Sequence, residues 1–399
     1  MNVIGLMSGT SADGVDAALV DIRGSGHDLR IRLRAYRTLP YPAEFRVRLL
    51  EAMTSGTVAD ACHLNAALGE WFAKAALRLL KAARVPAGRV ALIGSHGQTL
   101  HHLPRPRREP GIGAVRSTLQ LGAPAVIAER TGITTVGGFR TRDMAVGGEG
   151  APLTPYLHYL LFRHASLSRA VVNIGGISNL TYLPARGGLD AVRAFDTGPG
   201  NMLMDGVMRH VTADRRTFDR GGRLARVGTP NESLLGTLLE HPFLRRRPPK
   251  STGREEFGER FVGYFLRQGK LLGLSDSDLA ATATAYTART IAGARKFLPG
   301  SVDEVLVCGG GARNASLMRM LQGAWNDHSG RGPRQGRPSH THIPVGTVET
   351  LGWDGRALEA VAFAVFAYQH IKGVPCNLPN VTGAKKAVVL GMVAPGSKT

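Results

Sequence analysis

Val3-Ile4-Gly5-Leu6-Met7-Ser8-Gly9-Thr10-Ser11-Ala12-Asp13-Gly14-Val15-Asp16 is the stretch that decides the fold class. Apolar runs at 3–6 and 17–20 predict two strands joined by a glycine-rich turn. Glycines let backbone N–H groups approach a phosphate, and the serine and threonine hydroxyls add donors. Asp13 supplies a carboxylate of the kind that holds Mg²⁺ beside phosphates. An Asp-Gly pair is also a common hairpin turn, so this stretch alone leaves phosphate binding open.

Two later stretches have the same pattern, an apolar strand that ends in glycines. Residues 170–174 predict a strand that runs into Gly175-Gly176, with a return at 180–183. Residues 305–308 predict a strand before Gly309-Gly310-Gly311, and a helix is expected to start near Asn314, where its N-terminus favours anions. Neither a Walker P-loop nor a dinucleotide fingerprint is present. Two facing glycine turns, one from each domain, suit a nucleotide held in a cleft between them.

The alternation of apolar runs with longer helical periods is typical of an α/β protein. Helices are expected at 64–80, 153–162 and 357–370, and surface loops at 105–113 and 329–342. The repeated theme suggests duplication, with a boundary near residue 166. We expect a first domain of residues 1–165, on which 372–399 packs back, and a second of residues 166–371.

Composition excludes several classes of protein. The 399 residues are 43% hydrophobic and 20% charged, which is globular rather than disordered. No apolar run of about 18 residues and no signal-peptide pattern occur, so a soluble, cytoplasmic protein without a membrane partner is expected. The net charge is +20, but the arginines are scattered and aromatic residues make up only 6%. Nucleic-acid binding is therefore not expected as the primary function.

Two further motifs carry polar side chains at predicted strand ends. Asp196 follows an apolar strand and precedes Gly198-Pro199-Gly200, which suits a rigidly held general base. The alternative is a structural aspartate that caps the following helix, and the residues alone do not separate the two. His96, among small residues, either contacts a ligand or makes structural hydrogen bonds.

These motifs, in this order, resemble the anhydro-N-acetylmuramic acid kinases, a family of the actin/hexokinase/Hsp70-like ATPases. The likeness runs from Ile4 to Ala384. Its motifs are the 4–11 stretch, Ser95-His96-Gly97-Gln98-Thr99, Gly150-Ala151-Pro152-Leu153, Asn173-Ile174-Gly175-Gly176, Phe195-Asp196-Thr197-Gly198-Pro199-Gly200-Asn201, Lys250-Ser251-Thr252-Gly253-Arg254-Glu255, Cys308-Gly309-Gly310-Gly311-Ala312 and Pro379-Asn380-Val381-Thr382-Gly383-Ala384.

The resemblance implies two actin-like, ribonuclease H-like ATPase domains with the nucleotide between them. It implies Asp196 as the catalytic base, and the related levoglucosan kinases suggest Asp13 and Glu359 near a magnesium ion. The family is usually a cytoplasmic homodimer that binds ATP and a 1,6-anhydrosugar, hydrolyses the anhydro ring of anhydro-N-acetylmuramic acid and phosphorylates O6. The ATP-binding residues implied are Gly9, Thr10, Ser11, Ala12, Asp13, Gly14, Val15 and Asp16 for the phosphates, the turn Gly175 and Gly176, and Gly309, Gly310 and Gly311 on the adenosine side.

Two positions depart from the family pattern beside the expected sugar pocket. Gly138 stands where the family usually has Asp, and Glu149 stands where it often has Gln. The related levoglucosan kinases share the fold, and the end of the chain, 388–396, is similar to theirs. A levoglucosan kinase, or a kinase of another anhydrosugar, is therefore the alternative. An Hsp70-type ATP-gated binding module is less favoured, because no peptide-binding domain follows the ATPase lobes.

Overall fold

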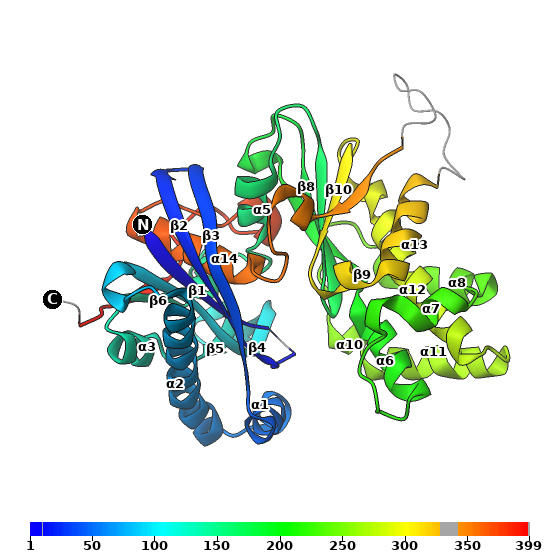
Figure 1. The fold of residues 1–399 in the computed structure, drawn as a ribbon, viewed down its shortest axis with the longest axis horizontal. Coiled ribbons are helices and arrows are strands. Elements are labelled where there is room, and N and C mark those ends of the chain that lie inside the picture. The colour runs from blue at the N-terminus through cyan, green and yellow to red at the C-terminus, as the bar shows by residue number, and fades with distance from the viewer. Residues whose placement is uncertain (10, 328–341, 398–399) are drawn as a thin grey trace. The chain divides into compact units, whose positions relative to one another are not determined.

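The computed structural model describes residues 1–9, 11–327 and 342–397. The chain divides into two compact units (Figure 1). One unit consists of Met1–Leu161 and Ala357–Thr399, and the other of Phe162–Arg356. Each unit has its own sheet and its own hydrophobic core.

The sheet of the first unit is built around the strand predicted from the opening stretch. Its central path runs β3-β2-β1-β4-β6, with β12 beyond β6 and β5 paired to β4. The first three strands form an antiparallel meander, and β4 and β6 follow in parallel orientation. The strands are β1 (Asn2–Ser8), β2 (Gly14–Ser25), β3 (Asp28–Pro40), β4 (Leu92–Glu109), β5 (Gly113–Leu121), β6 (Thr135–Gly137) and β12 (Met392–Ala394).

The sheet of the second unit repeats this order of strands. It runs β9-β8-β7-β10-β11, again an antiparallel meander followed by two parallel strands. The strands are β7 (Arg169–Ile174), β8 (Ile177–Leu183), β9 (Arg193–Pro199), β10 (Glu304–Cys308) and β11 (Val345–Thr347). The expectation of two α/β domains is confirmed, and the shared strand order agrees with duplication.

Helices cover both sheets. The first unit has α1 (Ala43–Ser55), α2 (Val58–Ala83), η1 (Ala87–Arg89), α3 (Pro124–Thr131), α4 (Phe139–Ala145), α5 (Pro155–Phe162), which ends at the unit boundary, α14 (Leu358–Ile371) and α15 (Pro379–Thr382). The second has η2 (Leu189–Ala191), α6 (Asn201–Val211), η3 (Arg220–Gly222), α7 (Arg223–Val227), α8 (Glu232–Leu239), α9 (Pro242–Arg245), α10 (Arg254–Phe257), α11 (Glu259–Leu271), α12 (Asp276–Gly293), η4 (Ala294–Phe297), η5 (Gly310–Arg313), α13 (Ala315–Asn326) and η6 (Val348–Leu351).

Strand β1 is buried on both faces by two helices. Ile4 and Leu6 belong to the core that α2 completes. Gly5, which alternation places on the opposite face, lies against the backbone of α14. A Cβ atom at Gly5 would stand 1.7 Å from the carbonyl oxygen of Ala360, so only glycine permits this approach.

The position of α14 corrects the expected domain bounds. Residues 357–371 were expected in the second domain, but α14 packs on β1 and β4 of the first sheet. Gly94 of β4 allows the same close approach as Gly5, since a Cβ there would stand 1.9 Å from the carbonyl oxygen of Phe363. The helix period showed that a helix exists here but not which sheet it covers.

The prediction of a surface loop at residues 105–113 is wrong over most of that range. Strand β4 continues to Glu109 and pairs with β5, with Arg107 opposite Val115 and Glu109 opposite Gly113. Pro104 and Pro106 fall at a register shift between Leu103 and Arg107, where a strand tolerates them, and Pro110 lies in the turn between β4 and β5. Of the other expected loop, residues 329–341 lie outside the described part of the chain.

Candidate active site

The turn after β1 is held by side chains from other elements of the first unit. Ser8 is buried, and its Oγ lies 2.6 Å from Gln98 Oε1 and 2.7 Å from the carbonyl oxygen of Gly14. Gln98 Nε2 donates to the carbonyl of Gly9 at 3.0 Å, and Ala12 closes the turn by donating its N–H to the same oxygen at 3.1 Å. A Cβ at Gly9 would meet no atom within 4 Å, so the turn borders open space. Thr10 lies outside the described residues.

Asp13 lies on the outer side of this turn. Its side chain is 67% exposed and pairs with Arg46 at 2.9 Å. The same guanidinium donates to the carbonyl oxygens of Ser11 and Ala12. Arg46, which the sequence analysis did not single out, therefore fixes the turn from α1. Asp13 remains accessible to a ligand that arrives at the turn.

Asp16, at the start of β2, and Glu359, in the first turn of α14, are an acidic pair in the sense that their charges lie near enough to interact. Asp16 accepts hydrogen bonds from Tyr36 at 2.6 Å and Thr38 at 2.5 Å. Burial, opposed by the charge of Arg140 and reinforced by the charge of Asp16, raises the pKa of Glu359 above its usual range. Two carboxylates are a sufficient protein contribution for Mg²⁺, which takes its remaining ligands from waters and phosphates. The described residues contain no group of three or more His, Cys, Asp or Glu placed to bind a metal.

Arg140 connects this acidic pair to His96. Its Nε donates to His96 Nε2 at 2.9 Å, and its Nη1 donates to the carbonyl of Gly150 at 2.7 Å. Because His96 Nε2 accepts, Nδ1 carries the proton and donates to the carbonyl of Gly97 at 2.8 Å. Burial, then the charge of Arg140, lowers the pKa of His96, so its ring is neutral at physiological pH. These contacts agree with the structural role considered for His96.

The two positions that depart from the family pattern lie in the same region of the chain as Arg140. Gly138 caps α4 with a φ of 66° and lines a cavity of about 450 Å³. A Cβ there would stand 2.9 Å from Met392 Cε, and left-handed backbone also favours glycine. Glu149 is partly buried, and this burial raises the pKa of its carboxyl group.

In the second unit the predicted glycine segments converge on Asn201. The N–H of Asn201 donates to the carbonyl of Gly175 at 2.7 Å, and its side-chain amide donates to the carbonyl of Ile174 at 3.2 Å. A Cβ at Gly310 or Gly311 would stand 3.4 or 3.2 Å from the Asn201 side chain. The structure therefore brings Gly175–Gly176 and Gly309–Gly311 together, although about 130 residues separate them. Asn201 belongs to the 195–201 motif, but its role in joining the two glycine segments was not predicted from the sequence.

Asp196 lies within β9 rather than after its end, which corrects the sequence-based placement. Its N–H donates to the carbonyl of Lys250 at 3.1 Å, and its Oδ2 accepts from the N–H of Thr252 at 2.9 Å. Helix α6 begins after Gly200, with no side chain capping it. The helix-cap alternative is therefore wrong, because the carboxylate bonds the 250–252 segment instead.

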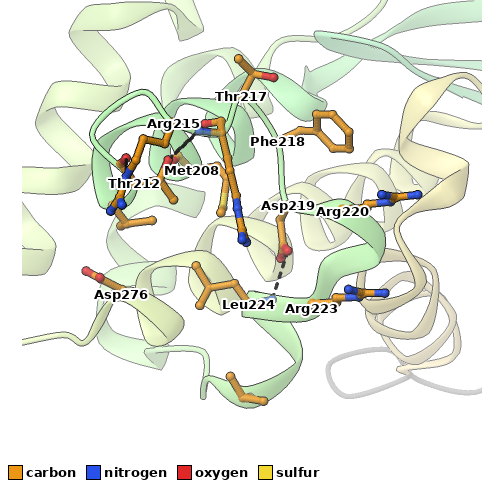
Figure 2. A pocket seen from close by; sticks show the side chains of 13 residues that line it. Met208, Thr212, Arg215, Thr217, Phe218, Asp219, Arg220, Arg223, Leu224 and Asp276 are labelled. Atoms are coloured by element: carbon orange, nitrogen blue, oxygen red, sulfur yellow. Dashed lines mark hydrogen bonds between the residues drawn. The ribbon is translucent and has the colours of Figure 1, made fainter.

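A larger cavity of about 830 Å³ lies elsewhere in the second unit (Figure 2). The apolar side chains of Met208, Phe218 and Leu224 line it. Asp219, another lining residue, accepts a hydrogen bond from the N–H of Leu224 at 3.1 Å. None of the residues predicted for the site lines this cavity. In the described part of the chain no helix is long and apolar enough to cross a membrane.

The family model and the similar proteins that match this chain all carry the same name. A family model described as anhydro-N-acetylmuramic acid kinase matches residues 1–396. The anhydro-N-acetylmuramic acid kinase of Gloeobacter violaceus is 46% identical over 397 residues, covering 98% of each chain. The enzyme of the same name from Caldanaerobacter subterraneus is 44% identical and covers 98% of this chain and 96% of its own.

The solved structures that align with the chain are less similar in sequence. An activator of 2-hydroxyisocaproyl-CoA dehydratase from Clostridium difficile with bound ADPNP aligns with a TM-score of 0.46 at 11% identity, covering 93% of this chain and 96% of that one. A ROK hexokinase from Thermus thermophilus aligns with a TM-score of 0.40 at 15% identity, covering 93% and 100%.

Proposed function

Because the chain belongs to the anhydro-N-acetylmuramic acid kinase family, we propose that it is an ATP-dependent kinase that opens the 1,6-anhydro ring of anhydro-N-acetylmuramic acid and phosphorylates O6. The product is N-acetylmuramic acid 6-phosphate, a sugar of cell-wall recycling. The observation that carries this proposal is the match of the family model from residue 1 to residue 396. The relatives reported above bear this family's name, so the levoglucosan kinase alternative is not favoured.

In the proposed reaction Asp196 accepts a proton from a water molecule that attacks the anomeric carbon. The bond between that carbon and the bridging oxygen breaks, and the oxygen forms a bond to the γ-phosphorus of ATP as the bond to ADP breaks. The hydrogen bond from the N–H of Thr252 to Oδ2 supports this role, because it orients the carboxylate. A general base within hydrogen-bond reach of the water is what this step requires.

We propose that ATP contacts residues of both units. The turn Gly9–Asp16, with Thr10 among its residues, would contact the phosphates, and the glycine segments around Asn201 would contact the remainder of ATP. The open space at Gly9 and the close packing of Gly309–Gly311 on Ile174 and Asn201 support these assignments. The cleft between the domains, the homodimer and the cytoplasmic location remain predictions that rest on the family.

Asp13 and Glu359 are the proposed magnesium ligands, and Asp16, whose charge acts on Glu359, is an alternative partner for Glu359. Mg²⁺ would neutralise charge on the phosphates when bound. Burial, and to a lesser degree the charge of Asp16, raises the pKa of Glu359. This supports the role, since an ionised carboxylate that is buried and near another carboxylate is stabilised when a cation binds to it.

The function is tested by coupled detection of ADP release with anhydro-N-acetylmuramic acid and with levoglucosan, each at limiting concentration. We expect turnover with the amino sugar at a higher kcat/KM than with levoglucosan. Turnover of levoglucosan without turnover of the amino sugar would show that the protein is a levoglucosan kinase instead. Turnover of neither sugar would contradict the proposal.

Replacing Glu359 with glutamine is expected to raise the Mg²⁺ concentration for half-maximal activity by about 10- to 100-fold. The melting temperature should not fall, because a carboxyl group with a raised pKa costs stability at neutral pH when ionised. Calorimetric titration of Mn²⁺ into the variant with a non-hydrolysable ATP analogue measures the metal site directly. Glu44→Gln is the matched control, since Glu44 occupies the first turn of α1 and is exposed. Unchanged metal affinity in Glu359→Gln would exclude Glu359 as a ligand.

A further inference from the structure

Lys250 is a buried cation enclosed by aromatic rings. The residue is 9% exposed. Its Nζ lies 4.5 Å from the ring centroid of Phe243, 4.6 Å from that of Phe297 and 5.8 Å from that of Phe195. The nitrogen also donates to the carbonyl of Phe243 at 3.3 Å. Ring faces attract the ammonium group, and together with this single hydrogen bond they hold the side chain in one place.

The backbone that carries Lys250 holds Asp196 at two points. The carbonyl of Lys250 accepts from the N–H of Asp196, and two residues later the N–H of Thr252 donates to its carboxylate. Phe195, one wall of the aromatic enclosure, directly precedes Asp196 in β9. Fixing the Lys250 side chain therefore also fixes the segment that orients the carboxylate.

A cation in this position is costly for the fold. Burial, followed by repulsion from Lys296, lowers the pKa of Lys250 to about 8, while Asp196 opposes the shift. The other charged groups that act on it are Arg246, which lowers this pKa, and Glu256, which raises it. With a folded pKa below the unfolded one, the charged lysine destabilises the fold at neutral pH, and stability rises as pH increases through about 8 toward the unfolded value. An apolar side chain of similar size would pack here without that cost.

We propose that Lys250 is a positioning residue for Asp196, in which the enclosed ammonium group favours the ionised carboxylate and the backbone at 250–252 orients it. The proposal rests on the proposed role of Asp196 as the base. The charge of Lys250 and the charge of Asp196 stabilise each other, so removing either one changes the titration of the other.

The first test is the pH profile of kcat/KM. Lys250→Met keeps the volume of the side chain and removes its charge, so the acidic limb should move to higher pH, by on the order of half a pH unit or more. Activity should fall more at pH 5 to 6 than at pH 8, with the melting temperature unchanged or raised. Lys250→Arg keeps the charge, so the acidic limb of its pH profile should lie at the wild-type position. Lys74→Met is the matched control, because Lys74 also lies over an aromatic ring, that of Trp71 at 4.6 Å, but is exposed and belongs to the first unit.

The second test does not depend on turnover. The chain has nine lysines, few enough for the ¹³Cε signal of Lys250 to be assigned by its loss in Lys250→Met. Titration should place the pKa of Lys250 near 8 in the wild type. The value should fall in Asp196→Asn, which loses an attractive charge, and rise in Lys296→Met, which loses a repulsive one.

The outcomes separate the two proposals. An unmoved acidic limb in Lys250→Met, or an unchanged Lys250 pKa in Asp196→Asn, would overturn the role of Lys250 while Asp196 could still be the base. An active Asp196→Asn variant would instead overturn the proposed base. In that event the NMR titration would still show whether the two charges interact.

Discussion

Asp196→Asn is expected to lower kcat by about 10²- to 10⁴-fold, the usual contribution of a general base. Asparagine has the shape of aspartate and an oxygen that can still accept from the N–H of Thr252, so the fold and the binding of ATP and sugar should be nearly unchanged. What the variant lacks is a group that accepts a proton from water. Steady-state kinetics and melting curves of the purified variant measure both expectations.

Asp190→Asn provides the control for this substitution. Asp190 is exposed and lies just before β9, so the same chemical change there should leave kcat at its wild-type value. If Asp196→Asn is as stable as the wild type and keeps most of its kcat, the assignment of the base is wrong, and with it the proposed order of bond changes.

Gly5→Ala is expected to destabilise the first unit by about 3 kcal/mol or more, at the upper end of overpacking effects. The added Cβ would stand 1.7 Å from a backbone oxygen of α14, which cannot rotate away as a side chain could. For a unit of this size the melting temperature should fall by roughly 10 °C. Because α14 also carries Glu359, the Mg²⁺ requirement of any folded variant should increase.

Gly88→Ala is the control within the same unit. A Cβ at Gly88 meets no atom within 4 Å, and the residue is exposed in η1. Alanine there should be neutral or slightly stabilising, because it restricts the unfolded chain. If thermal unfolding shows Gly5→Ala to be as stable as Gly88→Ala, the close contact between β1 and α14 does not exist in solution.

The surroundings of Lys250 could not be predicted from the motif that contains it. Its motif was recognised as part of the family resemblance, but nothing in the residues 250–255 indicates an aromatic enclosure. Phe195, Phe243 and Phe297 come from three separate elements, and each is an ordinary core residue in its own segment. The enclosure exists only because the fold brings those elements together.

Local sequence was sufficient where the governing interactions are between near neighbours. The strands around Gly9, the strand that leads into Gly175-Gly176 and the start of α13 at Asn314 were all predicted, because strand alternation, turn glycines and helix caps act over a few residues. Tertiary structure decided the rest: that α14 covers the first sheet, that β4 continues past its prolines, and that Asp196 bonds the 250–252 segment instead of capping a helix. These outcomes depend on contacts between residues far apart in the chain, whose energies no local pattern contains.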